Sequence, residues 1–211
     1  MAKTDMNYVI NNGKRELDHN SKVQRQIEYL SPSLYPLGVK SETVLKLGQL
    51  LRKKMEASNL GTLTQPFIIV CKNNIHKAIF ALLLLMVNNK EVGKFVRYKV
   101  IDIEDARQDY LKDSMDYSDA DVLFVKLNYS EIPHMYNAYC IRNLAQLRLE
   151  QGKYTFFYFW GTKSQLESNK WKLDEQGDGA SNANRILTPI THYVSYIDLN
   201  KDIEKEGGKN A

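Results

Sequence analysis

The sequence predicts an α/β protein of three layers, in which helices cover both faces of a mainly parallel sheet of five strands. Strand-like and helix-like patterns alternate from residue 66 to residue 199, which is the order that produces parallel sheets. The runs at residues 67–70, 120–125 and 154–160 are almost wholly apolar, as expected of strands that are covered on both faces. A chain of 211 residues has room for one such domain of about 150 residues and an appendage.

The appendage is expected at the N-terminus. Residues 1–40 are polar and basic and contain Pro32 and Pro36, so we expect a flexible arm with one short helix over residues 21–30. The α/β domain then spans residues 41–200, with its core at 64–200, and a charged tail follows at 201–211. Ser41 is a suitable N-cap for a helix whose apolar residues recur at helical spacing up to about residue 57.

The core begins with the strand at 67–70, and a polar loop leads from it into a helix built on the apolar run 78–87. That run has ten residues, whereas about 20 are needed to cross a bilayer, so it predicts a buried helix and no membrane span. The remaining strands are expected at 95–102, 120–125, 154–160 and 193–199. Helices are expected at 103–111, at 133–150 with Gly152 closing it, and at 162–169 with Thr162 and Gln165 as a capping box.

The helix predicted at residues 133–150 would turn one stripe of side chains inward. Arg148 is expected on its solvated face, with contact to a partner or to nucleic acid as the alternative. A polar segment with glycines at 174–184 predicts a disordered loop before the last strand. The inward stripe is expected to contain Met135, Tyr139, Arg142 or Asn143, Leu144 and Leu147.

The loop after the first core strand has the layout of a P-loop, in which loop amides and a helix N-terminus bind phosphate. On the pattern G-x-x-x-x-G-K-[ST], Lys77 takes the place of the lysine. Cys71 and His76 replace the two glycines, and Ala78 replaces the hydroxyl residue that would bind Mg²⁺. These positions therefore describe a degenerate nucleotide site, because side chains stand where the backbone must approach phosphate.

An ATPase would need a second, acidic motif at the end of the strand at 120–125, where a carboxylate reaches the magnesium shell. The residues that follow this strand are Lys126 and Leu127. A lysine there would repel Mg²⁺, so both metal-binding positions are missing together. The four histidines are scattered and the two cysteines have no ligand spacing, so we predict no metal, no cofactor and no ATP hydrolysis.

Several segments together resemble a known family. They are the loop at 71–78, the run at 118–131, the strand at 154–160 with residues 161–166 after it, and residues 184–186 before the last strand. In order and spacing, residues 64–200 resemble the AAA+ domain of bacterial replicative helicase loaders and the related transposition-helper ATPases. The resemblance implies a P-loop NTPase-like fold and a polar sensor at the end of the fourth strand, where Gly161 or Thr162 stands here. It also implies that Arg185 faces the nucleotide site of a neighbouring subunit, and hence a homo-oligomer.

The degenerate motifs and the resemblance lead to our main hypothesis. The chain is expected to be a non-catalytic AAA+-like protein, a pseudo-ATPase, of a DNA-replication, phage or mobile-element system. It would bind a protein partner such as a helicase, a polymerase or another ATPase. Because the chain has two cysteines and no apolar run in its first twelve residues, we expect a reducing, cytoplasmic location.

The distribution of charge supports a second hypothesis, a nucleic-acid-binding module. Residues 1–60 carry ten Lys or Arg and six Asp or Glu, so they account for the whole formal net charge of +4. The thirteen tyrosines include rings on which bases could stack. The alternatives are a solvated surface for the charges and simple packing for the rings. Candidate contacts to a partner or to nucleic acid are Arg52, Lys53, Lys54, Tyr129, Tyr136, Arg142 and Arg185.

A third hypothesis is an enzyme of another α/β class, with a site at the carboxyl ends of the strands near Cys71, Asp102 and Lys126. The thiol of Cys71 could have a lowered pKa, or it could be buried and inert. Lys77 is either a remnant phosphate ligand or an ordinary lysine at a helix start. His76 is either a general base or a polar surface residue.

Overall fold

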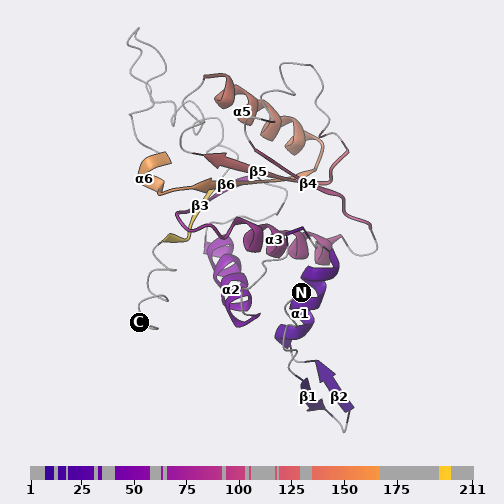
Figure 1. Ribbon diagram of the computed structural model, residues 1–211. Helices are drawn as coiled ribbons and strands as arrows, with labels where there is room; N and C mark the ends of the chain where they lie inside the picture. The colour runs from indigo at the N-terminus through magenta and orange to yellow at the C-terminus, as the bar shows by residue number, and fades with distance from the viewer. Residues whose placement is uncertain are drawn as a thin grey trace. The chain divides into compact units, whose positions relative to one another are not determined.

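The computed structural model describes residues 8–11, 14–17, 19–30, 33–34, 41–57, 63, 66–91, 94–102, 105, 117, 119–128, 135–166 and 195–200. The chain divides into two compact units. One unit contains residues 1–54 and 75–95, and the other contains residues 55–74 and 96–211. Figure 1 shows the elements of both units with their labels.

The first unit begins with an antiparallel hairpin of β1 (Tyr8–Asn11) and β2 (Lys14–Leu17), and α1 (His19–Leu30) follows it. We expected only a short helix over residues 21–30, so the hairpin is an addition. The pairing of Asn11 with Lys14 leaves a two-residue connection, which in the sequence is Asn12-Gly13. Asn-Gly is the dipeptide that most strongly favours such hairpins, so the signal was present in the sequence.

Two longer helices complete the first unit, α2 (Ser41–Ala57) and α3 (His76–Lys90). The bounds of α2 are those predicted, and its buried side chains follow a helical stripe. A Cβ atom at Gly48 would lie 3.2 Å from Leu82 Cδ2, so α2 and α3 approach closely at this glycine. The helix α3 is buried on all its faces over residues 78–85, which confirms the predicted buried helix. The buried stripe of α2 contains Val44, Leu47, Leu51 and Met55.

The second unit contains a sheet of five parallel strands in the order β4-β5-β6-β3-β7. The predicted α/β class and the five strands are thus confirmed. A row of aromatic side chains crosses three strands, since the ring of Phe156 lies 5.1 Å from that of Phe67 and 5.7 Å from that of Phe124. The strands are β3 (Phe67–Cys71), β4 (Tyr98–Asp102), β5 (Val122–Asn128), β6 (Tyr154–Trp160) and β7 (Ser195–Asp198).

The largest differences from the predicted strand boundaries are at the start of β4 and at the end of β5. We expected a strand from residue 95, but Phe95 is 89% exposed and β4 begins at Tyr98. The carbonyl oxygen of Arg97 instead accepts hydrogen bonds from two amides that lead into β5. We also expected a strand to end at residue 125, whereas β5 continues to Asn128 because its last residues stay in register with β6. Lys126 and Leu127 are therefore strand residues.

The helix α5 (Met135–Glu150) lies along one face of the sheet, as Figure 1 shows. Its end is the predicted one: Gly152 has a φ of 67°, and its amide and that of Lys153 donate to the carbonyls of Leu149 and Arg148. The predicted inward stripe is only partly correct. Leu144 is buried as expected, but Leu147 is exposed and Arg148 is buried in its place.

The last short helix, α6 (Lys163–Leu166), has the predicted capping box. The amide of Thr162 donates to Gln165 Oε1 at 2.8 Å, and the amide of Gln165 donates to Thr162 Oγ1 at 3.2 Å. Among the described residues no helix is long and apolar enough to span a membrane. The predicted helix at 103–111, apart from residue 105, and the loop at 174–184 lie outside the described residues.

Candidate functional site

The carboxyl edge of a parallel sheet is the edge at which open α/β proteins bind their ligands. In the strand order β4-β5-β6-β3-β7, the connection from β3 to β4 runs toward the β4 edge of the sheet and passes β6 and β5. The connection from β6 to β7 runs toward the opposite edge and passes β3. The topological switch point therefore lies between β3 and β6, where ligands of open α/β sheets bind. The segments that meet there are residues 71–74, 158–161 and 198–200.

Backbone hydrogen bonds and one buried amide side chain tie these segments together. Gly161 donates its amide to the carbonyl of Cys71 at 3.1 Å. Asn200, which is buried, donates its Nδ2 to the carbonyl of Gly161 at 3.1 Å and accepts from the amide of Lys72 at 2.7 Å. The carboxylate of Asp198 orients Asn200 by accepting from both its backbone amide and its Nδ2 at 3.0 Å. The ends of β3, β6 and β7 thus form one hydrogen-bonded network.

Two aromatic residues of β6 hold the loop that follows β3. The indole Nε1 of Trp160 donates to the carbonyl of Lys72 at 2.9 Å, and the hydroxyl of Tyr158 donates to the carbonyl of Asn73. Tyr158 is buried, whereas 51% of Trp160 is exposed. The predicted degenerate P-loop therefore begins with a stretch whose backbone groups are already bound by side chains of the same unit.

The thiol of Cys71 is fully buried at the end of β3. Burial raises its pKa above the ordinary thiol value, and hydrogen bonds from Asn73 and Tyr158 oppose this shift only in part. Of the two alternatives for Cys71, the inert buried thiol is the one that fits. A thiol with a raised pKa is a poor nucleophile at neutral pH.

The carboxyl ends of β4 and β5 carry an ion pair. Lys126 Nζ lies 2.9 Å from Asp102 Oδ1, and the two residues are register partners on neighbouring strands. Both side chains are partly exposed, whereas Leu127, the other residue at the predicted acidic motif, is buried. The structure therefore brings together the two charged residues of the enzyme hypothesis as a mutually neutralising pair. Among the described residues no group of three or more His, Cys, Asp or Glu could hold a metal ion.

The other predicted nucleotide-site residues lie at the start of α3, in the first unit. The backbone of Ile75 precedes the helix without a side-chain cap. The ring of His76 lies 5.9 Å from that of Phe80, edge to face, and Lys77 is exposed. Ala78, which replaces the hydroxyl residue, is buried.

Sequence reasoning placed Arg148 on a solvated helix face, and this is wrong. Only 2% of the residue is exposed, and its guanidinium lies at the amino ends of β5 and β6. Burial lowers its pKa to about 10, although the charge of Asp121 acts in the opposite direction. The partners are Thr155 Oγ1 at 2.9 Å and the carbonyl oxygens of Tyr117 at 2.8 Å, Ala120 at 3.0 Å, Tyr154 at 3.1 Å and Asp121 at 3.4 Å.

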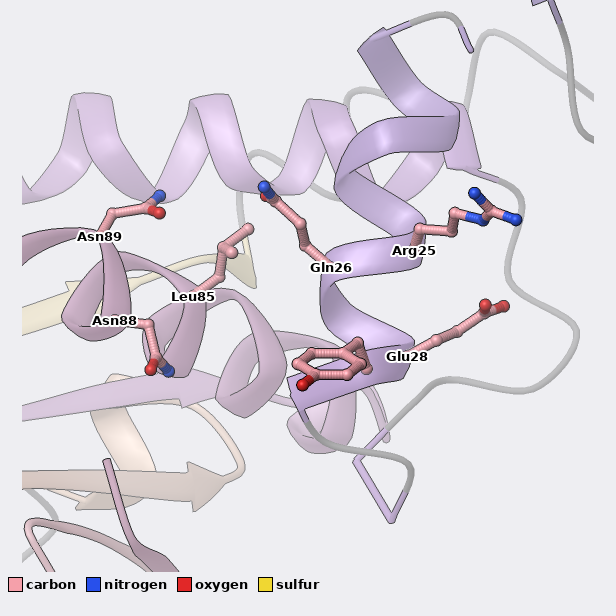
Figure 2. Close-up of a pocket in the computed structure, with 7 residues that line it drawn as sticks. Arg25, Gln26, Glu28, Leu85, Asn88 and Asn89 are labelled. Carbon is pink, nitrogen blue, oxygen red and sulfur yellow. The ribbon is translucent and has the colours of Figure 1, made fainter. Parts of the chain in front are cut away.

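The first unit has a groove of its own, of about 720 Å³, between α1 and α3. Figure 2 shows Arg25 and Glu28 projecting from α1 away from Asn88 and Asn89 of α3. Tyr29, which also lines the groove, is 87% exposed. The groove thus combines one cation, one acid, an aromatic ring and several carboxamides, and it contains no cluster of catalytic side chains. Its remaining lining residues are Gln26 and Leu85.

The structure places some of the predicted contact residues. Arg52 and Lys53 are exposed on α2, and Lys54 is partly buried there. Tyr129 and Arg185 lie outside the described residues. Tyr136 and Arg142 belong to the described helix α5, but their side chains lie outside the described part.

No family model, no curated protein and no solved structure matches this chain.

Proposed function

We propose that the protein is a non-catalytic AAA+-like interaction protein, a pseudo-ATPase of a DNA-replication or mobile-element system. Its partner would be a helicase, a polymerase or another ATPase. The order of strands supports this proposal, because β6 lies between β3 and β5. The end of β6, the expected sensor position, therefore falls between the P-loop-like loop and the strand that should carry the acidic motif.

The observation that carries the proposal is the ion pair at the ends of β4 and β5. An ATPase needs a carboxylate there to reach the magnesium shell. Here the position is a lysine whose Nζ lies 2.9 Å from Asp102 Oδ1, so the carboxylate of Asp102 is already neutralised. A divalent cation at this place would meet a positive charge and would have to displace a salt bridge.

The loop after β3 supports the same conclusion. Phosphate binding by a P-loop depends on loop amides that point at the ligand. The amide of Lys72 instead donates to Asn200, and the carbonyls of Lys72 and Asn73 are held by Trp160 and Tyr158. The buried methyl group of Ala78 supplies no oxygen to a metal.

The test is a calorimetric titration of the full chain with MgATP, together with a phosphate-release assay. We expect neither saturable heat nor phosphate release, and the variants Lys77→Ala and Lys126→Asp should behave like the natural chain. Saturable MgATP binding that Lys77→Ala abolishes would overturn the proposal. Purification of the tagged chain from its native cell would then test the partner class, with a replication ATPase, helicase or polymerase as the expected companion.

A second candidate function, nucleic-acid binding, is favoured by the exposed cations of the first unit. Lys22 and Arg25 on α1 and Arg52 and Lys53 on α2 are exposed, and Tyr29 offers an accessible ring one helical turn from Arg25. Electrostatic binding to phosphates weakens steeply with salt. Exposed aromatic rings can in addition stack on unpaired bases.

This candidate is tested by fluorescence anisotropy with a labelled single-stranded oligonucleotide at low and moderate salt. If it is correct, the double variant Arg25→Glu and Arg52→Glu weakens binding and flattens the dependence on salt. The matched control is Lys94→Glu, which reverses the charge of an exposed lysine that forms an ion pair with Glu91 three residues away. A titration that stays flat for the natural chain at low salt would exclude the candidate.

A further inference from the structure

The two units of the chain differ in the sign of their net charge. The first unit, residues 1–54 and 75–95, contains thirteen Lys or Arg and six Asp or Glu, which gives a formal net charge of +7. The second unit contains sixteen Lys or Arg and nineteen Asp or Glu, which gives a net charge of −3. The positive charge of the protein therefore belongs to the unit that contains α1 and α3. An excess of this size attracts polyanions such as nucleic acids.

The same unit contains the groove between α1 and α3, which we call the α1–α3 groove. Its volume of about 720 Å³ lies in the range of about 300–1,000 Å³ that holds small ligands. The ring of Tyr29 lines it and is 87% exposed, and the buried Leu85 adds apolar surface. Three of the other lining side chains are uncharged carboxamides, those of Gln26, Asn88 and Asn89.

We propose that the α1–α3 groove binds one unpaired base of a single-stranded nucleic acid. The base stacks on Tyr29, the carboxamides form hydrogen bonds with its edge, and Arg25 binds a phosphate beside it. The inference rests on the second candidate function, nucleic-acid binding, and it names the site and the form of nucleic acid that this function would use.

Tyr29 and Arg25 provide the ring and the cation that a nucleotide requires. They are four residues apart on α1, so they lie on one face of the helix, one turn or about 5.4 Å apart. Both are exposed, and in the described part of the chain neither side chain has a hydrogen bond, an ion pair or a ring contact. One nucleotide can therefore reach both. A ring beside a cation is the arrangement that binds single strands by stacking and by charge.

The carboxamides of the groove can bind the edge of a base. Figure 2 shows the side chain of Gln26 pointing from α1 toward Leu85 of α3. Asn88 is held in place, because its Nδ2 donates to the carbonyl oxygen of Leu84 at 2.9 Å, and its Oδ1 remains as an acceptor. Asn89 is exposed. A carboxamide offers a donor next to an acceptor, which matches the donors and acceptors on the edge of a base.

An unpaired base fits this groove better than a duplex or an acidic protein segment. In a duplex both faces of each base are stacked on neighbouring bases, so a ring such as that of Tyr29 has no face to cover. The lining contains one cation, Arg25, and one acid, Glu28, so it has no net charge of its own. An uncharged heterocycle suits such a lining, whereas a carboxylate inside the groove would meet Glu28. The excess charge of the unit then acts on the phosphates of the strand.

The test is fluorescence anisotropy of the full chain with four labelled probes at low salt. They are a single-stranded oligonucleotide, the same strand with abasic positions in place of its bases, the duplex, and an oligoglutamate peptide. The abasic strand keeps the phosphates and loses the bases, so it separates attraction by charge from binding of a base. We expect the intact single strand to bind at least about fivefold more tightly than any of the other three probes.

Four variants locate the binding. Tyr29→Ala should weaken binding of the intact strand by at least about fivefold and leave the abasic strand unchanged. Tyr29→Phe keeps the ring and should keep most of the affinity. Arg25→Gln should reduce the slope of log K against log salt by about 1. The matched control is Phe95→Ala, which removes another aromatic side chain of the first unit that is 89% exposed, and it should change nothing. Circular dichroism melting verifies that each variant is folded.

The inference is overturned if the abasic strand binds as tightly as the intact strand, if Tyr29→Ala has no effect, or if the duplex or oligoglutamate binds in preference. The site and the function on which it rests can fail separately. Binding of the intact strand that Arg52→Glu weakens but Tyr29→Ala does not would contradict only the α1–α3 groove. The absence of binding by any nucleic acid at low salt would contradict the nucleic-acid function as well.

Discussion

The two ends of the parallel sheet use polar side chains in opposite ways. At the amino ends of β5 and β6 the charged group is Arg148, which is withdrawn from solvent and binds four backbone carbonyls and one hydroxyl. At the carboxyl ends of the strands the charges of Lys72, Lys126 and Asp102 stay partly or fully accessible. The charged side chain is buried at the amino ends, whereas charged side chains reach solvent at the carboxyl ends.

The difference teaches which end of this sheet serves stability and which can serve function. A guanidinium among carbonyls binds acceptor groups of the buried backbone, and it leaves nothing for a ligand. The network around Asn200 also satisfies backbone groups, but it holds a half-exposed indole at its border. Parallel α/β sheets in general bind ligands at their carboxyl edge, in agreement with this division.

The largest expected effect concerns Arg148. Arg148→Met should lower the free energy of unfolding by more than about 3 kcal/mol, because it removes all the hydrogen bonds of a buried guanidinium at once, and each hydrogen bond to a charged group contributes about 1.5–3 kcal/mol. Arg148→Lys keeps the charge but cannot reach the same set of oxygens, so it should be intermediate. Urea denaturation provides the measurement. The control is Gln146→Ala on the exposed face of α5, with an effect within about 0.5 kcal/mol. A decrease of less than about 1 kcal/mol in the free energy of unfolding for Arg148→Met would show that the amino ends depend on their charged group no more than on a surface ion pair.

The next effect concerns Gly161, at the carboxyl edge of the sheet. A Cβ atom at Gly161 would lie 2.7 Å from the Phe159 ring and 2.8 Å from Gln165 Oε1. Because Phe159 is fully buried, the ring has little room to move, and Gly161→Ala should cost about 1–3 kcal/mol of unfolding free energy. Thermal melting beside Ser164→Ala, an exposed neighbour, measures it. Equal melting temperatures for the two variants would show that the carboxyl edge is looser than the network implies.

A smaller effect is expected from the ion pair at the carboxyl ends. Lys126→Ala should reduce the free energy of unfolding by no more than about 1 kcal/mol, since the pair with Asp102 is partly exposed to solvent. A double-mutant cycle with Asp102→Ala isolates the coupling, which should shrink as salt is added. A coupling energy that is several-fold larger and insensitive to salt would mean that the carboxyl ends, like the amino ends, contain a charge that is shielded from solvent.

The smallest effect is a dependence of stability on pH through Cys71. Its folded pKa is raised by burial, so above the ordinary thiol pKa of about 8.5 the unfolded chain has released the proton that the folded chain keeps. Stability should therefore fall as pH rises through that value. Urea denaturation at several pH values, with Cys71→Ala as the reference, measures the difference in slope. Parallel slopes, or rapid alkylation of Cys71 in the folded chain, would contradict a buried thiol.

Local sequence patterns determined much of this fold. The apolar runs predicted the cores of the strands, the helical spacing predicted the bounds of α2, and Gly152 predicted the end of α5. The capping box of Thr162 and Gln165 could also be predicted from the sequence, because both partners lie within one helical turn. Such features depend on neighbours a few residues apart, and the sequence alone contains those neighbours.

Only the tertiary structure decided which polar residues are buried, paired or presented. Helical periodicity puts a charged residue in water by default, and Arg148 is buried because carbonyls about thirty residues away in the chain meet it there. Lys72 and Asn200 are separated by 128 residues and Trp160 and Lys72 by 88, so no local pattern could join them. The degenerate motif could be recognised in the sequence. The hydrogen bonds that fix its first residues form only when β3, β6 and β7 lie side by side.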